Sequence, residues 1–366
     1  MRGRPLLYRS YDQDAGLLNT AAKRWWTAAL LVAMVLVPFQ ASPDLVLLLA
    51  TASIAAIGAI GLNIVTGYAG QVSLGHAFFL GVGAYTASAI SGDPEGRTIG
   101  YGITNILVWL PAAGLVAGLA GVLIAPLATR LRGLYLAIVT LGLVFIGEHV
   151  FREWSELTGG AGVGRESAVP ELFGIEFATN GDYLTSEQKF FLLMLVLLLV
   201  FALGARNLAR SRIGRSFAAV RDRDMAAEMM AINLPRTKTV AFAISSFYAG
   251  CSGALIYSII GFFEPSTFGL LLSVQFIAMV LIGGAGTVSG AIMGALFISL
   301  LPTLTRELPA YVPFISGQVT DTPNVFQLEQ VLYGLLIVGF LLFEPRGLFG
   351  IWIRIRNYWK GWPFSY

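Results

Sequence analysis

Ten apolar runs, most of them close to the length of a membrane-spanning helix, dominate this sequence. A helix needs about 20 predominantly apolar residues to cross the hydrocarbon core of a bilayer. Charged residues make up only 12% of the chain, against roughly 25% in soluble domains, so a soluble fold could not cover its own surface. We therefore predict an all-α, polytopic transmembrane helical bundle of about ten segments. The expected segments are residues 25–40, 44–66, 72–90, 103–129, 133–150, 190–205, 239–262, 270–284, 288–303 and 327–343.

Three of these segments, residues 72–90, 270–284 and 288–303, are shorter and rich in glycine. They could be re-entrant or broken. Such backbone is tolerated at membrane depth only where protein or a water-filled cavity satisfies its polar groups. The 42 glycines of the chain lie largely inside apolar runs, where small residues let membrane helices approach closely.

The charges of two long connections predict the orientation of the chain. Residues 206–238 carry eight basic and three acidic side chains, whereas residues 151–189 carry three basic and seven acidic ones. Basic connections stay in the cytoplasm, so we expect a cytoplasmic loop at 206–238 and an external loop at 151–189. Counting spans outward places both termini in the cytoplasm. We divide the chain into a cytoplasmic N-terminal segment (1–24), a transmembrane domain (25–350) and an interfacial cytoplasmic tail (351–366).

A short sequence repeat marks two of the Gly-rich segments. Residues 67–73 (GYAGQVS) resemble residues 283–289 (GGAGTVS), and each copy leads from an apolar run into a short Gly-rich segment. Two related halves are common in transporters, whose transport path lies between them. We predict an internal two-fold repeat on this basis. The alternative is a coincidence between two turns rich in glycine and alanine.

The first copy of the repeat lies in a stretch, residues 61–85, whose pattern predicts an apolar helix that ends at a Gly-rich break and restarts. A break frees backbone amides and carbonyls at membrane depth, and helix ends offer partial charges to a polar solute. Polar side chains are costly there, which makes them candidates for the transport path. The simpler alternative is that these side chains form hydrogen bonds between helices and have only a structural role. The candidates in this stretch are Asn63, Gln71, Ser73 and His76.

Motifs of catalysis are missing from the sequence. An ATPase P-loop needs a Gly-Lys-Ser/Thr run to hold phosphate, and none of the four lysines follows a glycine. The single cysteine, Cys251, and the two isolated histidines have no metal-ligand spacing. Glu148 and His149 lie near the expected outer end of a helix, where interfacial solvation explains them. We therefore expect no catalytic residue, no metal site and no enzymatic activity. The net charge of +3 comes from basic residues flanking apolar runs, so it does not indicate nucleic-acid binding.

Four stretches resemble signature sequences of the branched-chain amino-acid ABC transporter permease family, in the branch usually called LivM. They are residues 61–79 (GLNIVTGYAGQVSLGHAFF), residues 132–142 (RGLYLAIVTLG) followed by 157–160 (LTGG), residues 283–290 and residues 343–350 (FEPRGLFG). The resemblance implies a permease subunit of an ATP-driven importer for branched-chain or other neutral amino acids. The same machinery importing urea, amides or polar amino acids is the alternative. An ion-coupled secondary transporter would need carboxylates inside the membrane, and the expected spans contain almost none.

The resemblance also implies partners and a location. These partners are a second permease (LivH-type), two ATPase subunits (LivG/LivF-type) and an external solute-binding protein, all at a bacterial plasma (inner) membrane. This chain would bind no cofactor itself, and ATP with Mg²⁺ would be bound by the ATPases. Residues around 61–85 and 283–300 would line the path, which adds Ser289 to the four candidates above.

Residues 213–234, inside the basic loop, favour a helix with apolar anchors among charged side chains. Such a helix can lie in a groove of another protein, or alternatively on anionic lipid. In the resembled family this loop docks on the ATPase subunit. One departure is Ala231, which stands where the family usually has glycine before an Ile-Asn pair. The coupling candidates are Gly214, Arg215, Phe217, Val220, Arg221, Met225, Glu228, Met229 and Asn233.

Overall fold

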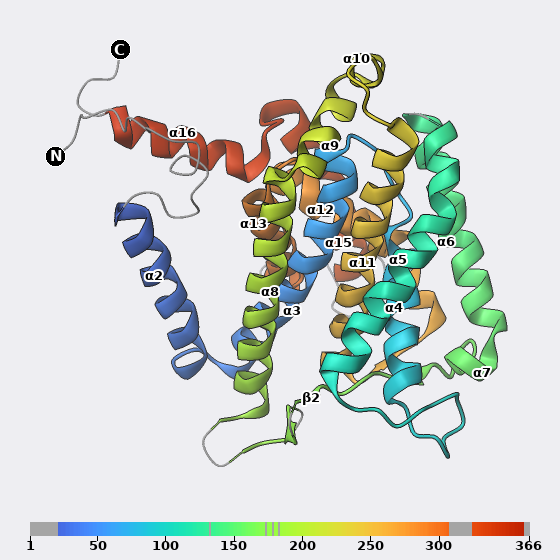
Figure 1. Cartoon of the computed structure of the whole chain (residues 1–366). Coiled ribbons are helices and arrows are strands. Elements are labelled where there is room, and N and C mark those ends of the chain that lie inside the picture. Colours follow the sequence, from blue (N-terminus) through green and yellow to red (C-terminus); the bar gives the residue numbers. More distant parts are fainter. Residues whose placement is uncertain are drawn as a thin grey trace.

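The computed structural model describes residues 21–361, apart from residues 132, 173, 178, 182, 183 and 307–323. Residues 1–20 of the expected N-terminal segment and residues 362–366 of the expected tail therefore lie outside the described residues. Within the described part, a helix lies at each of the ten expected positions (Figure 1). These helices are α2 (Ala21–Leu36), α3 (Pro43–Asn63), α4 (His76–Ser91), α5 (Ile106–Arg130), α6 (Leu134–Glu153), α8 (Ser186–Arg210), α11 (Leu234–Ile260), α12 (Leu270–Gly283), α13 (Val288–Arg306) and α15 (Val325–Phe343).

Seven of the described helices are long and apolar enough to cross a bilayer. They are α3, α5, α6, α8, α11, α13 and α15. This confirms the expected polytopic helical fold. Of the three segments expected to be short, α4 has 16 residues and α12 has 14. The third, α13, is longer than expected, with 19 residues, because its helix continues past Pro302 to Arg306.

Helices α3 and α11 form the centre of the bundle. α3 packs against α8, α11 and α13, while α11 packs against α3, α4 and α5. Both are apolar on nearly all sides, as expected of helices surrounded by protein. A Cβ on Gly83 of α4 would overlap the carbonyl oxygen of Gly250, and a Cβ on Gly253 would overlap the carbonyl of Leu80. Helices α4 and α11 therefore meet backbone against backbone, which small residues alone allow.

Apolar side chains cover the outside of the bundle. In Figure 1, α2 stands apart from the other helices on the side of α8, and α6 lies at the opposite side. Trp25 of α2, Phe145 and Ile146 of α6, and Leu335 and Val338 of α15 are all exposed. Exposed apolar area of this extent is typical of surfaces that face lipid or another protein.

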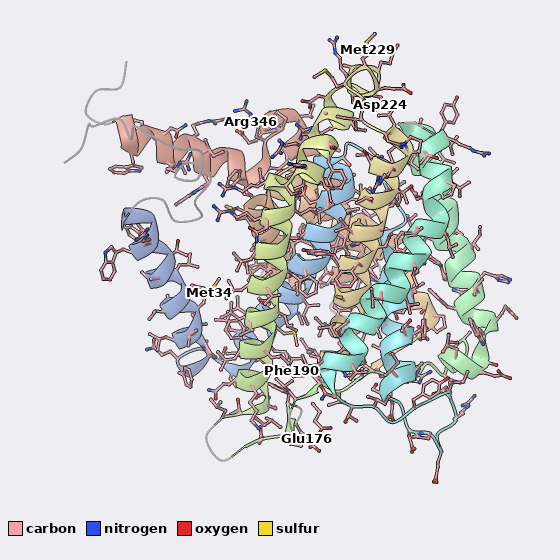
Figure 2. The ribbon with its side chains drawn as sticks, in the orientation of Figure 1. Met34, Glu176, Phe190, Asp224, Met229 and Arg346 are labelled. Carbon is pink, nitrogen blue, oxygen red and sulfur yellow. The ribbon has the colours of Figure 1, made fainter. Side chains whose placement is uncertain are left out.

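One end of the bundle carries short strands. After α6, the helix α7 (Ser155–Thr158) leads to β1 (Arg165–Glu166), which pairs antiparallel with β4 (Phe262–Phe263). A second pair joins β2 (Glu171–Leu172) to β3 (Ile175–Glu176). Figure 2 shows Glu176 at this end. These residues, apart from β4, fall within 151–189, so the expected polar loop is a folded connection at one end of the bundle.

Arg165 holds that connection to the bundle. Its side chain is 3% exposed and donates hydrogen bonds to the carbonyl oxygens of Leu157, Ser88 and Ile99. Burial lowers the pKa of Arg165 from its ordinary value, and the nearby phenol of Tyr85 acts in the opposite direction. The guanidinium thus joins the end of α4 to α7 and to the loop at Ile99 through backbone groups.

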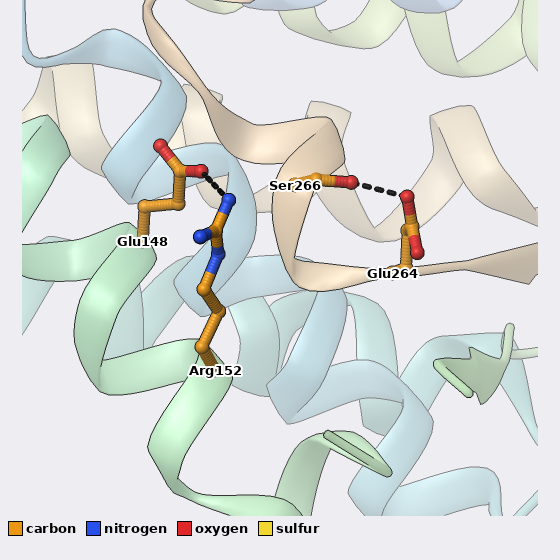
Figure 3. A network of polar contacts seen from close by, with 4 residues as sticks. All are labelled: Glu148, Arg152, Glu264 and Ser266. Carbon is orange, nitrogen blue, oxygen red and sulfur yellow. Dashed lines mark hydrogen bonds and ion pairs between the residues drawn. The ribbon is translucent and has the colours of Figure 1, made fainter. Parts of the chain in front are cut away.

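An ion pair stands near the same end, in the last turns of α6. Glu148 accepts from Arg152 one turn later at 2.5 Å, next to the turn in which Ser266 donates to Glu264 (Figure 3). His149 is exposed. Glu148 is therefore engaged in an ion pair at the helix end, in keeping with the interfacial role expected for it.

The other end of the bundle, which we call the α9 end, carries α9 (Arg212–Asp222), α10 (Asp224–Met229) and the long α16 (Gly347–Gly361). Figure 1 shows that α2 also starts at the α9 end and that the strands lie at the opposite end. The basic connection and the acidic connection are therefore at opposite ends, as the count of spans requires. The placement of the α9 end in the cytoplasm stays a prediction.

Candidate functional site

The first Gly-rich stretch is a helix break. α3 ends at Asn63, widens into the π-helical turn η2 (Ile64–Tyr68), and α4 restarts at His76. Gly70 has a φ of 68°, a left-handed conformation that glycine adopts at little cost. Such π-helical turns inside α-helices occur frequently at functional positions. Residues 69–75 thus form a non-helical segment between the two helices, as the sequence predicted.

The second Gly-rich stretch is also a break, between the end of α12 at Gly283 and the start of α13 at Val288. Gly284 and Gly286 have φ values of 115° and 82°. In the sequence repeat, Gly286 corresponds to Gly70, and both take the left-handed conformation. This shared conformation supports the predicted two-fold repeat.

Asn63 joins the two breaks. Its Nδ2 donates to the carbonyl oxygen of Thr287 at 2.9 Å, and its Oδ1 accepts from the amide of Gly286 at 2.8 Å. The side chain is completely buried. A Cβ on Gly67 would overlap Oδ1 of Asn63 and the amide of Gly286, so glycine is what lets the two breaks come together. One carboxamide thus satisfies backbone groups that the second break leaves free.

Gln71, Ser73 and His76 lie on the segment that leads from the first break into α4, and all are less than 7% exposed. The amide of Leu74 donates to Thr140 of α6 at 2.9 Å, and that of Ala77 donates to Ser273 of α12 at 3.0 Å. These two hydroxyls fix the start of α4 against its neighbours. Ser73 also accepts from the amide two residues later at 3.4 Å.

Two of these buried side chains carry polar atoms that have no hydrogen-bond partner within the described residues. The atoms without a partner are Nε2 and Oε1 of Gln71 and Nε2 of His76. The His76 ring lies 5.0 Å from that of Phe276, and the backbone of Gly58 is close enough to hydrogen-bond its imidazole. Buried polar groups are nearly always paired, so these atoms are candidate positions for water or a polar solute. Their role in transport stays a prediction.

Ser289 lies apart from that group. It is exposed, on the first turn of α13, and it lines a cavity of about 500 Å³ between α13 and α8. The structure therefore brings Asn63 next to Gly286 and Thr287. It buries Gln71, Ser73 and His76 near the start of α4, whereas Ser289 is exposed at the start of α13.

Helix α9 contacts the first break through Arg221. Its Nη1 donates to the carbonyl oxygen of Gly67 at 3.0 Å and lies beside Gly286, and its aliphatic stem covers Gly70. Arg221 also pairs with Asp222 at 3.2 Å. Arg221 thus contacts both breaks. It lies against Gly70 and Gly286, which have left-handed conformations, and it donates to the carbonyl oxygen of Gly67 in the first break.

The apolar anchors of the loop divide into two groups. Phe217 of α9 is buried in the core of the bundle, and Val220 is buried in a separate small cluster with Ala227 and Leu234. Met225 and Met229 of α10 are exposed at the tip, where Figure 2 labels Met229. Lys238 of α11 pairs with Asp224 at 3.1 Å and holds the start of α10. One group therefore attaches the loop to the bundle, and the other is left facing outward.

The remaining coupling candidates have structural or exposed positions. Gly214 is buried, and a Cβ there would overlap the carbonyl of Leu208. Arg215 donates to the carbonyl of Arg210 at 3.0 Å, and Asn233 caps α11 by accepting from the amide of Arg236 at 3.0 Å. Glu228 is exposed on α10.

Ala231 makes the turn between α10 and α11 with a φ of 59°, the one positive φ at a non-glycine residue in the part of the chain that the structure describes. A left-handed conformation is unfavourable for alanine by roughly 1–2 kcal/mol. The chain therefore takes a left-handed turn at this position, although the residue there is alanine and not the glycine that suits the turn.

Sequence reasoning missed Thr140, Ser273 and Thr287, whose hydroxyl or carbonyl oxygens hold the breaks. Isolated Ser and Thr residues are common in apolar helices, where most bond the carbonyl of the preceding turn. Nothing in their local pattern separates these three from the others. Among the described residues, no group of His, Cys, Asp or Glu is arranged to hold a metal ion.

Comparisons with known proteins identify the family of this chain. Residues 45–341 match the family described as "Branched-chain amino acid transport system / permease component". The chain is 31% identical over 346 residues to the high-affinity branched-chain amino acid transport system permease protein LivM of Escherichia coli, covering 90% of this chain and 76% of that protein. No solved structure matches it.

Other relatives are less similar to this chain, and their names cover more than one solute. The chain is 23% identical over 302 residues to the branched-chain permease LivH of Escherichia coli, covering 81% of this chain and 91% of that protein. It is 26% identical over 283 residues to the ribose import permease RbsC of Haemophilus influenzae, covering 74% of this chain and 80% of that protein.

Proposed function

The chain belongs to the branched-chain amino acid ABC permease family, with a LivM-type sequence, and from this premise we propose that it forms half of the translocation path of an ATP-driven amino-acid importer. Members of this family are transport permeases and not enzymes. The family and the seven long apolar helices make the chain a multi-pass protein of the inner membrane.

The main support for the proposal is the contact of α9, in the basic loop, with the two Gly-rich breaks. Arg221 of α9 donates to the carbonyl of Gly67, and Asn63 joins that break to residues 286–287. A force applied to α9 from outside the bundle would therefore reach both Gly-rich turns directly. Because short helix breaks are where transporters rearrange around a solute, this attachment offers a direct route from ATP hydrolysis to opening of the path.

The proposed partners follow from the surfaces that remain exposed. Met225, Met229 and Met230 project from the end of the loop, and flexible methionines suit a partner surface that must repack between states. We assign them to contact with a LivG/LivF-type ATPase, which binds ATP and Mg²⁺. A LivH-type second permease would complete the path, and an external solute-binding protein would deliver the substrate to the strand end.

Branched-chain amino acids are the proposed substrates, since the LivM relative of Escherichia coli is named for their transport. The path candidates are Asn63, Gln71, Ser73, His76 and Ser289, and the unpaired atoms of Gln71 and His76 are the best placed among them to meet a polar solute. The alternative of another neutral solute, such as urea, an amide or a polar amino acid, stays open because relatives of this chain include a ribose permease.

Uptake of labelled leucine tests the proposal in cells with and without the gene. We expect deletion to abolish leucine uptake, and we expect unlabelled isoleucine and valine, but not glutamate or urea, to compete with the uptake in the parent strain. If deletion leaves leucine uptake unchanged but abolishes uptake of urea or a polar amino acid, the importer assignment would stand and the proposed substrate would be wrong. Unchanged uptake of every solute tested would reject the permease assignment for this chain.

A further inference from the structure

Helix α16 begins directly at the end of a spanning helix. The exposed apolar residues of α15 run to Phe343, and a tight turn follows, in which the amide of Gly347 donates to the carbonyl oxygen of Glu344 at 2.7 Å. Figure 1 shows α16 running sideways from the bundle at the α9 end, whereas α10 projects outward from the same end. The 19 residues of α15 are about as long as the hydrocarbon core is thick. The start of α16 therefore lies at the level of the lipid head groups.

One face of α16 is apolar and exposed. Trp352, Ile355 and Trp359 follow one another at spacings of three and four residues, so they lie on one face of the helix. Tyr358, three residues after Ile355, lies at the edge of this face. Each of the four residues is between 47% and 69% exposed. Contact between water and this much apolar surface is unfavourable, so the face is suited to an apolar environment that the described residues do not supply.

The other sides of α16 are polar and basic. Arg354, Arg356 and Asn357 are all exposed there. Arg354 pairs with Glu344 at the end of α15 at 2.6 Å and is still 73% exposed, so the ion pair fixes α16 relative to the span without burying the guanidinium. Residues 344–356 hold three arginines and one glutamate, and the segment therefore stays positively charged with this pair counted.

We propose that α16 lies on the surface of the bilayer at the α9 end and binds anionic lipid, with its apolar face toward the acyl chains and its arginines at the phosphate groups. Helices with Trp on one face and basic residues on the other bind membrane surfaces in this way, and Trp and Tyr are enriched at this level of the bilayer. The remaining positive charge favours anionic over neutral lipid, because each basic side chain near an anionic surface contributes about fivefold in affinity.

The position of α16 favours a lipid surface over a partner subunit as the occupant of its apolar face. Leu342 and Phe343, at the end of α15, are 71% and 86% exposed and lie one tight turn before α16 along the chain. The apolar face thus continues a surface that already belongs to a membrane span. The exposed methionines of α10, which we assign to the ATPase, are on the element that projects outward from this end (Figure 1).

A helix held on lipid would also hold the second Gly-rich break. A Cβ on Gly347 would overlap the carbonyl oxygen of Ile282, and a Cβ on Gly284 would overlap that of Arg346, so the start of α16 packs backbone against backbone on this break. Asn63 holds the same break through Gly286. The importance of this contact for transport rests on the proposed function, whereas the lipid contact requires only that the chain is a membrane protein.

Spin labelling of the whole transporter in lipid vesicles tests the proposal. Ile355→Cys places a nitroxide on the apolar face, and Asn357→Cys places it about half a turn away, on the polar side. Both positions are exposed, whereas the one native cysteine, Cys251, is 1% exposed, so the parent chain should take no label. Oxygen concentrates in hydrocarbon, and a nickel chelate stays in water. We expect residue 355 to be accessible to oxygen and shielded from nickel, and residue 357 to show the reverse.

Vesicles of phosphatidylcholine, with and without phosphatidylglycerol, test the preference for anionic lipid. We expect phosphatidylglycerol to lower nickel access at residue 355 further. Arg356→Gln should lose most of this change, because it removes a charge from the basic side of α16. Arg236→Gln removes the same charge from an exposed position in the first turn of α11, also at the α9 end, and should retain the change.

Three outcomes would overturn the proposal. Equal nickel access at residues 355 and 357 would place the apolar face in water. Equal nickel access in the two lipid compositions would remove the role of anionic lipid. Shielding of residue 355 from both oxygen and nickel would show that a partner subunit covers the face. Each of these outcomes is independent of the importer assignment, which the uptake of leucine tests separately.

Discussion

The carboxamide of Asn63 and the backbone of Thr287 are hydrogen-bonded across 224 positions of sequence, with Nδ2 of Asn63 2.9 Å from the Thr287 carbonyl oxygen. The same carboxamide accepts from the neighbouring amide of Gly286 at 2.8 Å. The two Gly-rich breaks are therefore one structural unit, although each belongs to a different part of the sequence. Any motion of one break must either carry the other with it or break these two bonds.

Replacing Asn63 should destabilise this unit. Asn63→Ala leaves the Gly286 amide and the Thr287 carbonyl buried without a partner, and we expect a loss of about 2 kcal/mol in unfolding free energy. Thermal unfolding of the purified chain in detergent measures it. Asn207→Ala, at an exposed position on α8, is the matched control and should change the midpoint little. Equal midpoints for the two variants would show that the Asn63 bonds add nothing to stability.

Arg221 is expected to couple the loop to the breaks. Arg221→Gln removes the cationic donor to the Gly67 carbonyl while leaving the buried Phe217 and Val220 in place. Because the side chain is partly exposed, we expect an effect of about fivefold, corresponding to about 1 kcal/mol, on the solute transported per ATP hydrolysed. Proteoliposomes containing the whole transporter give this ratio.

Arg223→Gln serves as the control for Arg221, since it removes the same charge one residue beyond the end of α9. Its ratio of transport to hydrolysis should match the parent protein. A lowered transport rate with an unchanged ratio in Arg221→Gln would show that the arginine affects assembly or folding and not coupling.

The exposed methionines of α10 are expected to bind the ATPase subunit. Met229, which is 90% exposed, is the most prominent of them. Met229→Glu puts a charge into the proposed apolar contact and should release the ATPase during affinity purification, since burying an unpaired carboxylate is strongly unfavourable. Met229→Leu keeps the apolar area and should retain it. If Met229→Glu still copurifies with the ATPase, the docking surface lies elsewhere on the loop.

The sequence predicted the helices better than it predicted the contacts between them. Apolar runs of about 20 residues and the Gly-rich breaks are local patterns, so they located α3, α5 and both breaks to within a few residues. The pairing of Asn63 with Gly286 depends on how distant helices pack, and no local pattern contains that information. The same holds for the burial of Phe217 and Met229. Both are large apolar residues of the same basic loop, yet Phe217 is buried and Met229 is exposed.

The close contact between α4 and α11 should be sensitive to a single methyl group. In Gly253→Ala, the added Cβ would overlap the carbonyl of Leu80 and push the helices apart, with a loss of about 1–3 kcal/mol in unfolding free energy. Gly334→Ala on α15 is the matched control, because no described atom outside its own helix turn lies within 4 Å of the position that its Cβ would take. We expect that control to be neutral or slightly stabilising, as alanine favours helix over glycine. Similar losses in both variants would mean that the helix contact does not require glycine at residue 253.

Ala231→Gly should stabilise the protein, in contrast to most glycine substitutions. Ala231 has a φ of 59°, and glycine takes that conformation without the steric penalty that alanine has. The gain should be about 1 kcal/mol, measured as a higher midpoint of thermal unfolding in detergent. Ala226→Gly, at another exposed alanine of the same loop but inside α10, should lower the midpoint, since glycine there adds only freedom to the unfolded chain. Opposite signs for the two substitutions identify the left-handed turn as the cause, whereas a fall in both would show that Ala231 is not strained in solution.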